Sequence, residues 1–167
     1  MSYENSFVYS LRQKVGDMRL ITAGVEVVPV NKKNQIKFVR SRDIEGWSIP
    51  GGHVELGDSW QSAALKELRE EVGIIANVGD LKICAIVSGP GRVFSYNDGT
   101  TQSFTVCFLC RDWEKEISFS DSEEIIEAKW MDIEQARKNV TSKRELMMLD
   151  AYEKFIMTEE IQMVFEE

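Results

Sequence analysis

Cysteine is scarce in this chain of 167 residues, so a disulfide framework is not expected. The three cysteines are an odd number, and no export signal is recognised ahead of them. Cys107 and Cys110 have the spacing of a redox motif. They lie in an apolar, β-like run, however, where residues three apart point to opposite faces of a strand. We therefore expect buried thiols and no redox pair.

Long hydrophobic runs are missing, and positive charge is in deficit. No apolar segment is long enough to span a bilayer and no basic-then-apolar leader is recognised, so we expect a cytoplasmic protein without a membrane partner. The 20 Lys and Arg face 28 Asp and Glu, for a net charge of −8. A nucleic-acid polymer is not an expected partner, because proteins that bind one carry basic patches. A small anionic substrate remains allowed, because bound metal ions can invert the local charge.

The remaining composition is that of an ordinary globular protein. Hydrophobic residues make up 43% of the chain and charged residues 29%. The length fits one domain with its own core, which we place over residues 1–167.

Hydrophobic periodicity indicates short strands framed by helices. Apolar residues at helical spacing predict an N-terminal helix at about residues 4–15, ending at Gly16. Alternating or apolar runs predict strands at about residues 20–30, 35–40, 81–87, 92–96, 101–110 and 128–131. The sequence Asn-Asp-Gly at 97–99 is a strong hairpin signal. Pro29 indicates that the first strand lies at a sheet edge or bulges there.

The last third of the chain is expected to be helical. Asp132 is the expected N-cap of one helix, and Ser142 and Glu145 have the spacing of a capping box. The box would open a long C-terminal helix at about residues 142–157. Strands outnumber helices before this region and several look antiparallel, so we predict an α+β layered sandwich.

The most informative segment is 51–74, which reads GGHVELGDSWQSAALKELREEVGI. Glu67, Glu70 and Glu71 are spaced i, i+3 and i+4, which places three carboxylates on one face of a helix. Like charges at this spacing repel, so the cluster makes sense if a cation fills it. Carboxylate sites suit hard divalent ions such as Mg²⁺ or Mn²⁺, which commonly act on phosphates.

The residues around the glutamates predict a rigid loop-helix-loop. We expect a strand to end at Pro50 and the chain to turn at Gly51 and Gly52. Asp58 and Ser59 are N-cap candidates, with Gln61 placed to complete a box with Asp58, and Gly73 would end the helix. The face opposite the glutamates is expected to be buried through Trp60, Ala63, Ala64, Leu68 and Val72.

This segment resembles the Nudix box, the signature of hydrolases that cleave a nucleoside diphosphate linked to another group. The matching positions are Gly52, Glu67, Leu68, Glu70, Glu71, Gly73 and Ile74. Two positions differ from the family pattern, with Asp58 in place of Glu and Lys66 in place of Arg. Lysine lacks the planar fork that grips a carboxylate. The resemblance implies a Nudix-type α/β/α sandwich, with a mixed sheet between helices and the box as the catalytic loop and helix.

The resemblance also implies roles for the acidic residues. Glu70 and Glu71 would bind the metal directly, with the Gly51 carbonyl as a further ligand. Glu67 would bind a second ion or act as the general base in a metal-assisted attack of water on phosphorus. The family often recruits another carboxylate from outside the box. In the acidic run 121–124 our choice is Glu124, with Glu127 behind it, so Glu67 and Glu124 are competing candidates for the base.

Substrate contacts are harder to read. Arg40, Arg42 and Arg92 could meet phosphate charge, although such residues are more often surface arginines. The aromatic residues Trp47, Phe94 and Tyr96 could stack on a base or belong to the core. His53, the one histidine, occupies a variable position of the box and is not an expected ligand.

The predicted function is metal-dependent hydrolysis of a pyrophosphate bond in a nucleoside diphosphate derivative. ADP-ribose or a sugar nucleotide is favoured, because a proline at the position of Pro90 tends to accompany ADP-ribose hydrolysis in the family. The alternatives are hydrolysis of nucleoside triphosphates or dinucleoside polyphosphates, and a Nudix-fold sensor that binds a nucleotide without turnover. The resemblance is compatible with a homodimer.

Overall fold

The computed structural model describes residues 3–42, 45–96, 98–117 and 124–167. Its helices are α1 (Phe7–Val15), α2 (Trp60–Val72), α3 (Ile133–Asn139) and α4 (Lys143–Thr158), with 3-10 turns at Tyr3–Asn5 and Val78–Asp80. Its strands are β1 (Leu20–Pro29), β2 (Ile36–Ser41), β3 (Gly51–His53), β4 (Ile74–Ile75), β5 (Leu81–Ser88), β6 (Val93–Tyr96), β7 (Gly99–Cys110), β8 (Lys115–Glu116), β9 (Ile125–Met131) and β10 (Gln162–Phe165).

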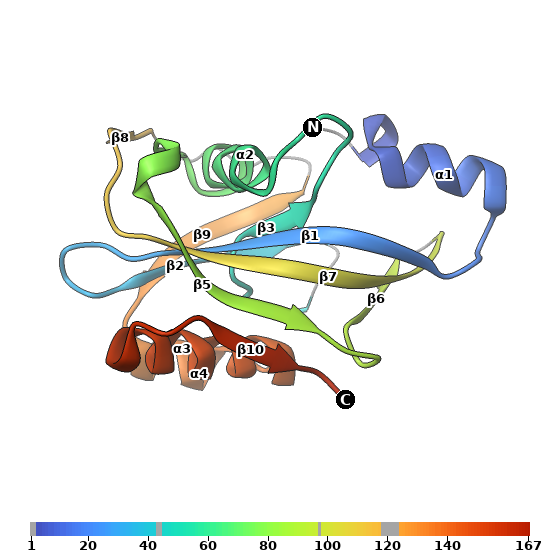
Figure 1. Cartoon of the computed structure of the whole chain (residues 1–167). Coiled ribbons are helices and arrows are strands. Elements are labelled where there is room, and N and C mark those ends of the chain that lie inside the picture. Colours follow the sequence, from blue (N-terminus) through green and yellow to red (C-terminus); the bar gives the residue numbers. More distant parts are fainter. Residues whose placement is uncertain (1–2, 43–44, 97, 118–123) are drawn as a thin grey trace.

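A mixed sheet forms the middle layer of the molecule. Its strand order is β10-β5-β7-β1-β3, with β6 paired to β7. The β1 and β7 strands run parallel, whereas β5 and β3 are antiparallel to their neighbours β7 and β1. A separate antiparallel ribbon joins β2 to β9. Figure 1 shows α2 on one face of the sheet and α3 and α4 on the other. The predicted α/β/α sandwich with a mixed sheet is confirmed.

Two hydrophobic cores hold these layers together. On one side, Leu68 and the other buried residues of α2 pack against Val27 and Val106 of the sheet. On the other, Leu149 of α4 packs against a separate set of sheet residues. Cys107 belongs to the α4-side core and Cys110 to the α2-side core. Both thiols are buried and free, as the strand alternation predicted.

Several local predictions are confirmed. Helix α1 ends at Gly16, which has a φ of 66°. The β6–β7 hairpin closes with Tyr96 opposite Gly99, and the turn residue Asn97 lies outside the described residues. Residues 121–123 of the acidic run also lie outside them.

Two strand predictions are wrong. The β1 strand is interior, because β7 pairs with it along its whole length and β3 pairs with its middle. Pro29 is tolerated there because it is the last residue of the strand, where a missing N–H costs little. The chain also does not turn away after Pro50. Gly51 to His53 form β3, in which Gly51 lies opposite Glu26.

Two helix predictions need correction as well. Trp60 is 48% exposed, because it occupies the first turn of α2, beyond the sheet face that buries the rest of the helix. Ser142 is the N-cap of α4 but makes no side-chain cap hydrogen bond. Glu145 does not complete a capping box; its side chain is drawn into the interior, where Ile49 N–H donates to Oε2 at 2.9 Å.

Candidate functional site

Helix α2 carries the acidic residues and is fixed at both ends. Ser59 and Ser62 form a reciprocal capping box, so the cap is Ser59 and the predicted pairing of Asp58 with Gln61 is wrong. Gly73 ends the helix in the left-handed conformation with a φ of 70°. As predicted, Ala63, Ala64, Leu68 and Val72 are buried. The side of the helix that carries the glutamates is thereby held next to β3.

Two glycines of β3 allow the backbone to approach these glutamates closely. Gly51 N–H donates a hydrogen bond to Glu71 Oε2 at 2.8 Å. A Cβ atom on Gly52 would lie 2.5 Å from Glu67 Oε1, and one on Gly51 would lie 2.3 Å from the Val25 carbonyl oxygen. No larger residue fits at either position without displacing its neighbours. The glycines therefore determine where the two carboxylates sit.

The carboxylates strongly influence one another. Burial, followed by the charges of Glu70 and Glu124, raises the pKa of Glu67 to about 7. Burial and the charge of Glu67 raise the pKa of Glu71 well above its ordinary value, although the Gly51 N–H opposes this shift. Crowded carboxylates that resist ionisation favour a cation beside them.

Glu124 lies near this cluster although it is distant in sequence. It directly precedes β9, and its carbonyl accepts a hydrogen bond from Arg42 N–H at 2.9 Å. Its charge raises the pKa of both Glu67 and Glu71. Glu127, in contrast, forms an ion pair with Arg40 at 3.1 Å. Of the two loop-side candidates, Glu124 is the one whose charge acts on the helix glutamates.

The chemistry of this cluster suits a hard divalent cation. Its donors are carboxylate oxygens and backbone carbonyls, which Mg²⁺ and Mn²⁺ prefer. Within the described part of the chain, no three His, Cys, Asp or Glu side chains lie close enough together to form a finished ligand set. Glu71 in particular is engaged by a backbone N–H. The residues fit a cation by charge and donor type, whereas their described positions do not form a ligand set.

A cavity of about 100 Å³ adjoins the cluster. Gly51, Gly52 and Glu71 form one side, and His53, Phe94 and Tyr96 are among its other lining residues. The rings of His53 and Tyr96 have centroids 6.0 Å apart. Ligand pockets for whole small molecules usually enclose about 300–1,000 Å³. This cavity is therefore large enough for only part of a nucleotide.

The three arginines considered for substrate contact lie in different surroundings. Arg40 is near the end of β2, where it pairs with Glu127 and lies 6.0 Å from the centre of the Trp47 ring. Arg42 follows the same strand. Arg92 is 1% exposed and pairs with Glu26 and with Glu166, the latter at 3.5 Å. The Arg92 charge is therefore directed to carboxylates of the chain itself.

Two buried carboxylates beside the cavity were not recognised from the sequence as part of the site. Glu26 and Glu145 both line the cavity. Burial, together with the charge of Glu26, raises the pKa of Glu145 to about 8. Arg92 and Arg144 partly oppose this shift. No spacing rule points to these residues. Glu26 lies within a strand, and the position of Glu145 in the sequence is explained by the capping-box spacing to Ser142.

Comparisons with known proteins match this architecture. A family model described as the NUDIX domain matches residues 20–150. An RNA pyrophosphohydrolase of Pelagibacter ubique (strain HTCC1062) is 31% identical over 122 residues, which cover 66% of this chain and 76% of that protein. The nucleoside triphosphatase NudI of Enterobacter sp. (strain 638) is 30% identical over 78 residues, or 45% of this chain and 55% of that protein. The matched segments cover 36%, 76% and 55% of the lengths of three curated relatives. In two of the three, this chain therefore spans less than two thirds of the relative's length.

Solved structures show the same fold. The NUDIX domain of Shewanella oneidensis NrtR, crystallised with ADP ribose, has a TM-score of 0.65 at 14% sequence identity. The likeness covers 93% of this chain and 99% of that chain.

Among the described residues, no helix combines the length and apolar character needed to cross a membrane.

Proposed function

Because the chain belongs to the Nudix hydrolase family, we propose that it hydrolyses a pyrophosphate bond in a nucleoside diphosphate derivative and requires Mg²⁺ or Mn²⁺. The observation that carries this proposal is the close packing of Glu67 and Glu71 against Gly51 and Gly52. Glu124 adds its charge to the same cluster. The resemblance to the Nudix box implies catalytic roles for Glu67 and Glu71, and Glu124 is our choice for the additional carboxylate from outside the box.

We assign the binding of the cation to Glu70, Glu71 and the Gly51 carbonyl, with Glu67 as a further ligand or the base. A cation bound there would neutralise phosphate charge and lower the pKa of a water molecule. Glu67 is our first choice of general base, because its carboxyl is part-buried against Gly52 and has a pKa of about 7. A carboxyl with such a pKa can take a proton from water at neutral pH. Glu124 is the second choice.

The substrate is assigned from the shape of the site and from the relatives. The small cavity beside Glu71 would take one part of the substrate, and Arg40 and Arg42 lie where they could meet phosphate groups outside it. Arg92 would act indirectly, by holding Glu26 at the cavity wall. ADP-ribose is our preferred substrate, because a structural neighbour was crystallised with it. Nucleoside triphosphates and dinucleoside polyphosphates are the next candidates.

The alternative function is a sensor that binds a nucleotide without turnover. The complete set of Glu67, Glu70 and Glu71 favours an enzyme, because binding alone does not need a general base. The test is to incubate the protein with ADP-ribose, nucleotide sugars, nucleoside triphosphates, dinucleoside polyphosphates and 5′-triphosphate RNA. Each is supplied with Mg²⁺, with Mn²⁺ or with a chelator, and phosphate and monophosphate products are measured. We expect metal-dependent release with ADP-ribose as the best substrate. Binding of several compounds with no release from any of them would instead establish the sensor.

A further inference from the structure

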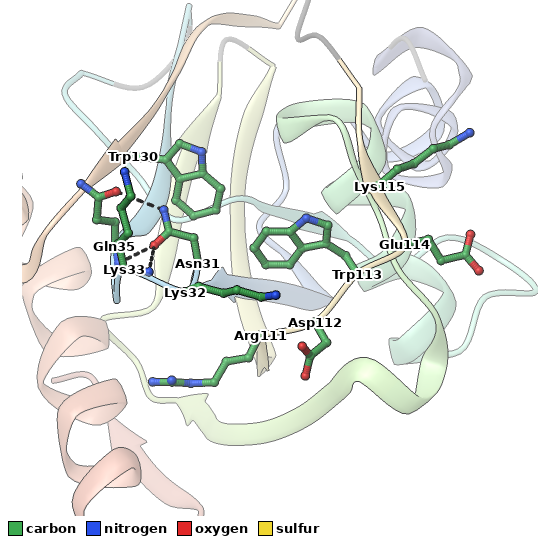
Figure 2. Close-up of a pocket in the computed structure, with 10 residues that line it drawn as sticks. All are labelled: Asn31, Lys32, Lys33, Gln35, Arg111, Asp112, Trp113, Glu114, Lys115 and Trp130. Carbon is green, nitrogen blue, oxygen red and sulfur yellow. Dashed lines mark hydrogen bonds between the residues drawn. The ribbon is translucent and has the colours of Figure 1, made fainter.

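A second and larger pocket lies at the other end of the β2–β9 ribbon (Figure 2). It encloses about 540 Å³ and is formed by the turn at 31–35, the segment 111–115 and Trp130 of β9. None of its lining residues also lines the cavity beside Glu71. Trp130 follows Glu124 by six residues, which is roughly 20 Å at the rise of a β-strand. A small ligand in this pocket would not touch the acidic cluster.

The pocket contains an aromatic surface made by Trp113 and Trp130. Their rings are stacked, with centroids 5.9 Å apart and planes inclined by 17°. No third ring fits between them, because a ring held between two others needs them about 7 Å apart, which is two contact distances of about 3.5 Å. The Lys37 ammonium already lies 5.3 Å from the centre of the Trp130 ring. Both tryptophans are partly buried, but Lys37 lies over Trp130, so Trp113 is the better platform for a planar ligand.

Cationic side chains outnumber anionic ones among the residues that line this pocket. Four cationic side chains line the pocket, from Lys32, Lys33, Arg111 and Lys115, against two anionic ones. Among the described residues, no ion pair engages the ammonium groups of Lys32, Lys33 or Lys115. Figure 2 shows the Lys32 side chain beneath the two indoles, and Glu114 and Lys115 both directed away from them. In a chain with a net charge of −8, such a cationic pocket is a local exception.

The turn that presents two of these lysines is ordered before any ligand binds. Asn31 Oδ1 accepts hydrogen bonds from the backbone N–H groups of Lys33 and Gln35, at 2.9 and 3.0 Å. Asn31 Nδ2 donates to Gln35 Oε1 at 3.1 Å. On the opposite side, the Arg111 guanidinium donates to the neutral oxygens of Asn34 and Tyr152, which hold it in place without neutralising it. The pocket thus combines a fixed aromatic face with an excess of two positive charges among its lining side chains.

We propose that this pocket is a second, non-catalytic binding site for a free nucleoside phosphate. The base would stack on Trp113, and the phosphate groups would be held by Lys32, Lys33 and Arg111. Its volume falls within the range of pockets that enclose a whole small ligand, about 300–1,000 Å³. Bases stack on aromatic side chains regardless of their identity, so the site would discriminate weakly between nucleobases.

Tryptophan fluorescence can test the site directly, because the chain has only four tryptophans. Replacing Trp47 and Trp60 by phenylalanine leaves Trp113 and Trp130 as the only indoles. This variant is titrated with AMP and with adenosine in the presence of a chelator, so that hydrolysis plays no part. We expect saturable quenching by AMP and weaker binding of adenosine. Adding Lys32→Glu and Lys33→Glu should weaken AMP binding by roughly tenfold or more, because charge-assisted contacts to phosphate are lost.

The matched control carries Lys82→Glu and Lys138→Glu, which reverse the same amount of charge at exposed positions outside the pocket. It should bind AMP as its parent does. Equal weakening in both double variants, or quenching that stays linear in AMP concentration, would overturn the proposal. A single-stranded oligoadenylate is titrated as well. If it bound much more tightly than AMP, the pocket would belong to an RNA chain and not to a free nucleotide.

Discussion

Glu67 and Glu124 are the two proposed candidates for the general base, and substituting each of them separates the two proposals. We expect Glu67→Gln to lower kcat by about 10²- to 10⁴-fold, the range for loss of a general base. Glu124→Gln should lower kcat by less than about tenfold, since it would change only the charge near the cluster. Steady-state kinetics at saturating metal measure both effects. The reverse order of the two losses would assign the base to Glu124.

Gly52 is the residue whose lack of a side chain permits the Glu67 carboxylate to sit against β3. A Cβ atom there would lie 2.5 Å from Glu67 Oε1, so Gly52→Ala must displace that carboxylate. We expect kcat to fall by about 100-fold, as for other small displacements of catalytic groups. Gly79→Ala is the control, because a Cβ atom at Gly79 meets nothing within 4 Å. Similar kcat values for the Gly52→Ala and Gly79→Ala variants would show that catalysis does not require the Glu67 carboxylate to lie against Gly52.

At the scale of the element, α2 and α4 have the same type of N-cap residue but use it differently. The Ser59 hydroxyl accepts the Ser62 N–H at 3.0 Å, whereas the Ser142 side chain makes no cap bond. We therefore expect Ser59→Ala to lower the free energy of unfolding by about 1 kcal/mol. Ser142→Ala should change it by a few tenths at most. Chemical denaturation compares the two, and an equal loss would contradict the assigned caps.

Local patterns predicted most elements but not how they assemble. Helix α2 could be read from its caps, its apolar face and the spacing of its three glutamates. The parallel pairing of β1 with β7 could not, because it joins Leu20 to Thr101 across a long stretch of chain. The same limit applies to side chains. The pairing of Arg92 with Glu26, and the bond from Ile49 to Glu145, depend on contacts that no local spacing records.

At the scale of the whole molecule, buried carboxyls make stability depend on pH. The pKa of Glu145 is raised from 4.5 to about 8, chiefly by burial. Between these values the native state holds a proton that the unfolded state has released, so the free energy of unfolding must fall as pH rises. Glu145→Gln should flatten this decline between about pH 5 and 8, because the amide introduced stays neutral and can still accept the Ile49 N–H. Denaturation at several pH values measures the slope. Glu160→Gln, at an exposed position, should leave it unchanged.

Cation binding should stabilise the whole fold, since it relieves repulsion that exists only when Glu67 and Glu71 are brought together. At a metal concentration 100-fold above the Kd, the gain is about 2.7 kcal/mol. For a chain of this length that corresponds to a Tm increase of about 5–10 °C. Glu71→Gln should raise Tm without metal, because it removes a carboxyl whose ionisation is opposed by burial and by Glu67, and should abolish most of the increase with Mg²⁺ or Mn²⁺. Glu127→Gln is the control, because its carboxylate pairs with Arg40, and its Tm should respond to metal as the wild type does. If the wild-type Tm failed to respond to either ion in thermal denaturation, the acidic cluster would not be a cation site.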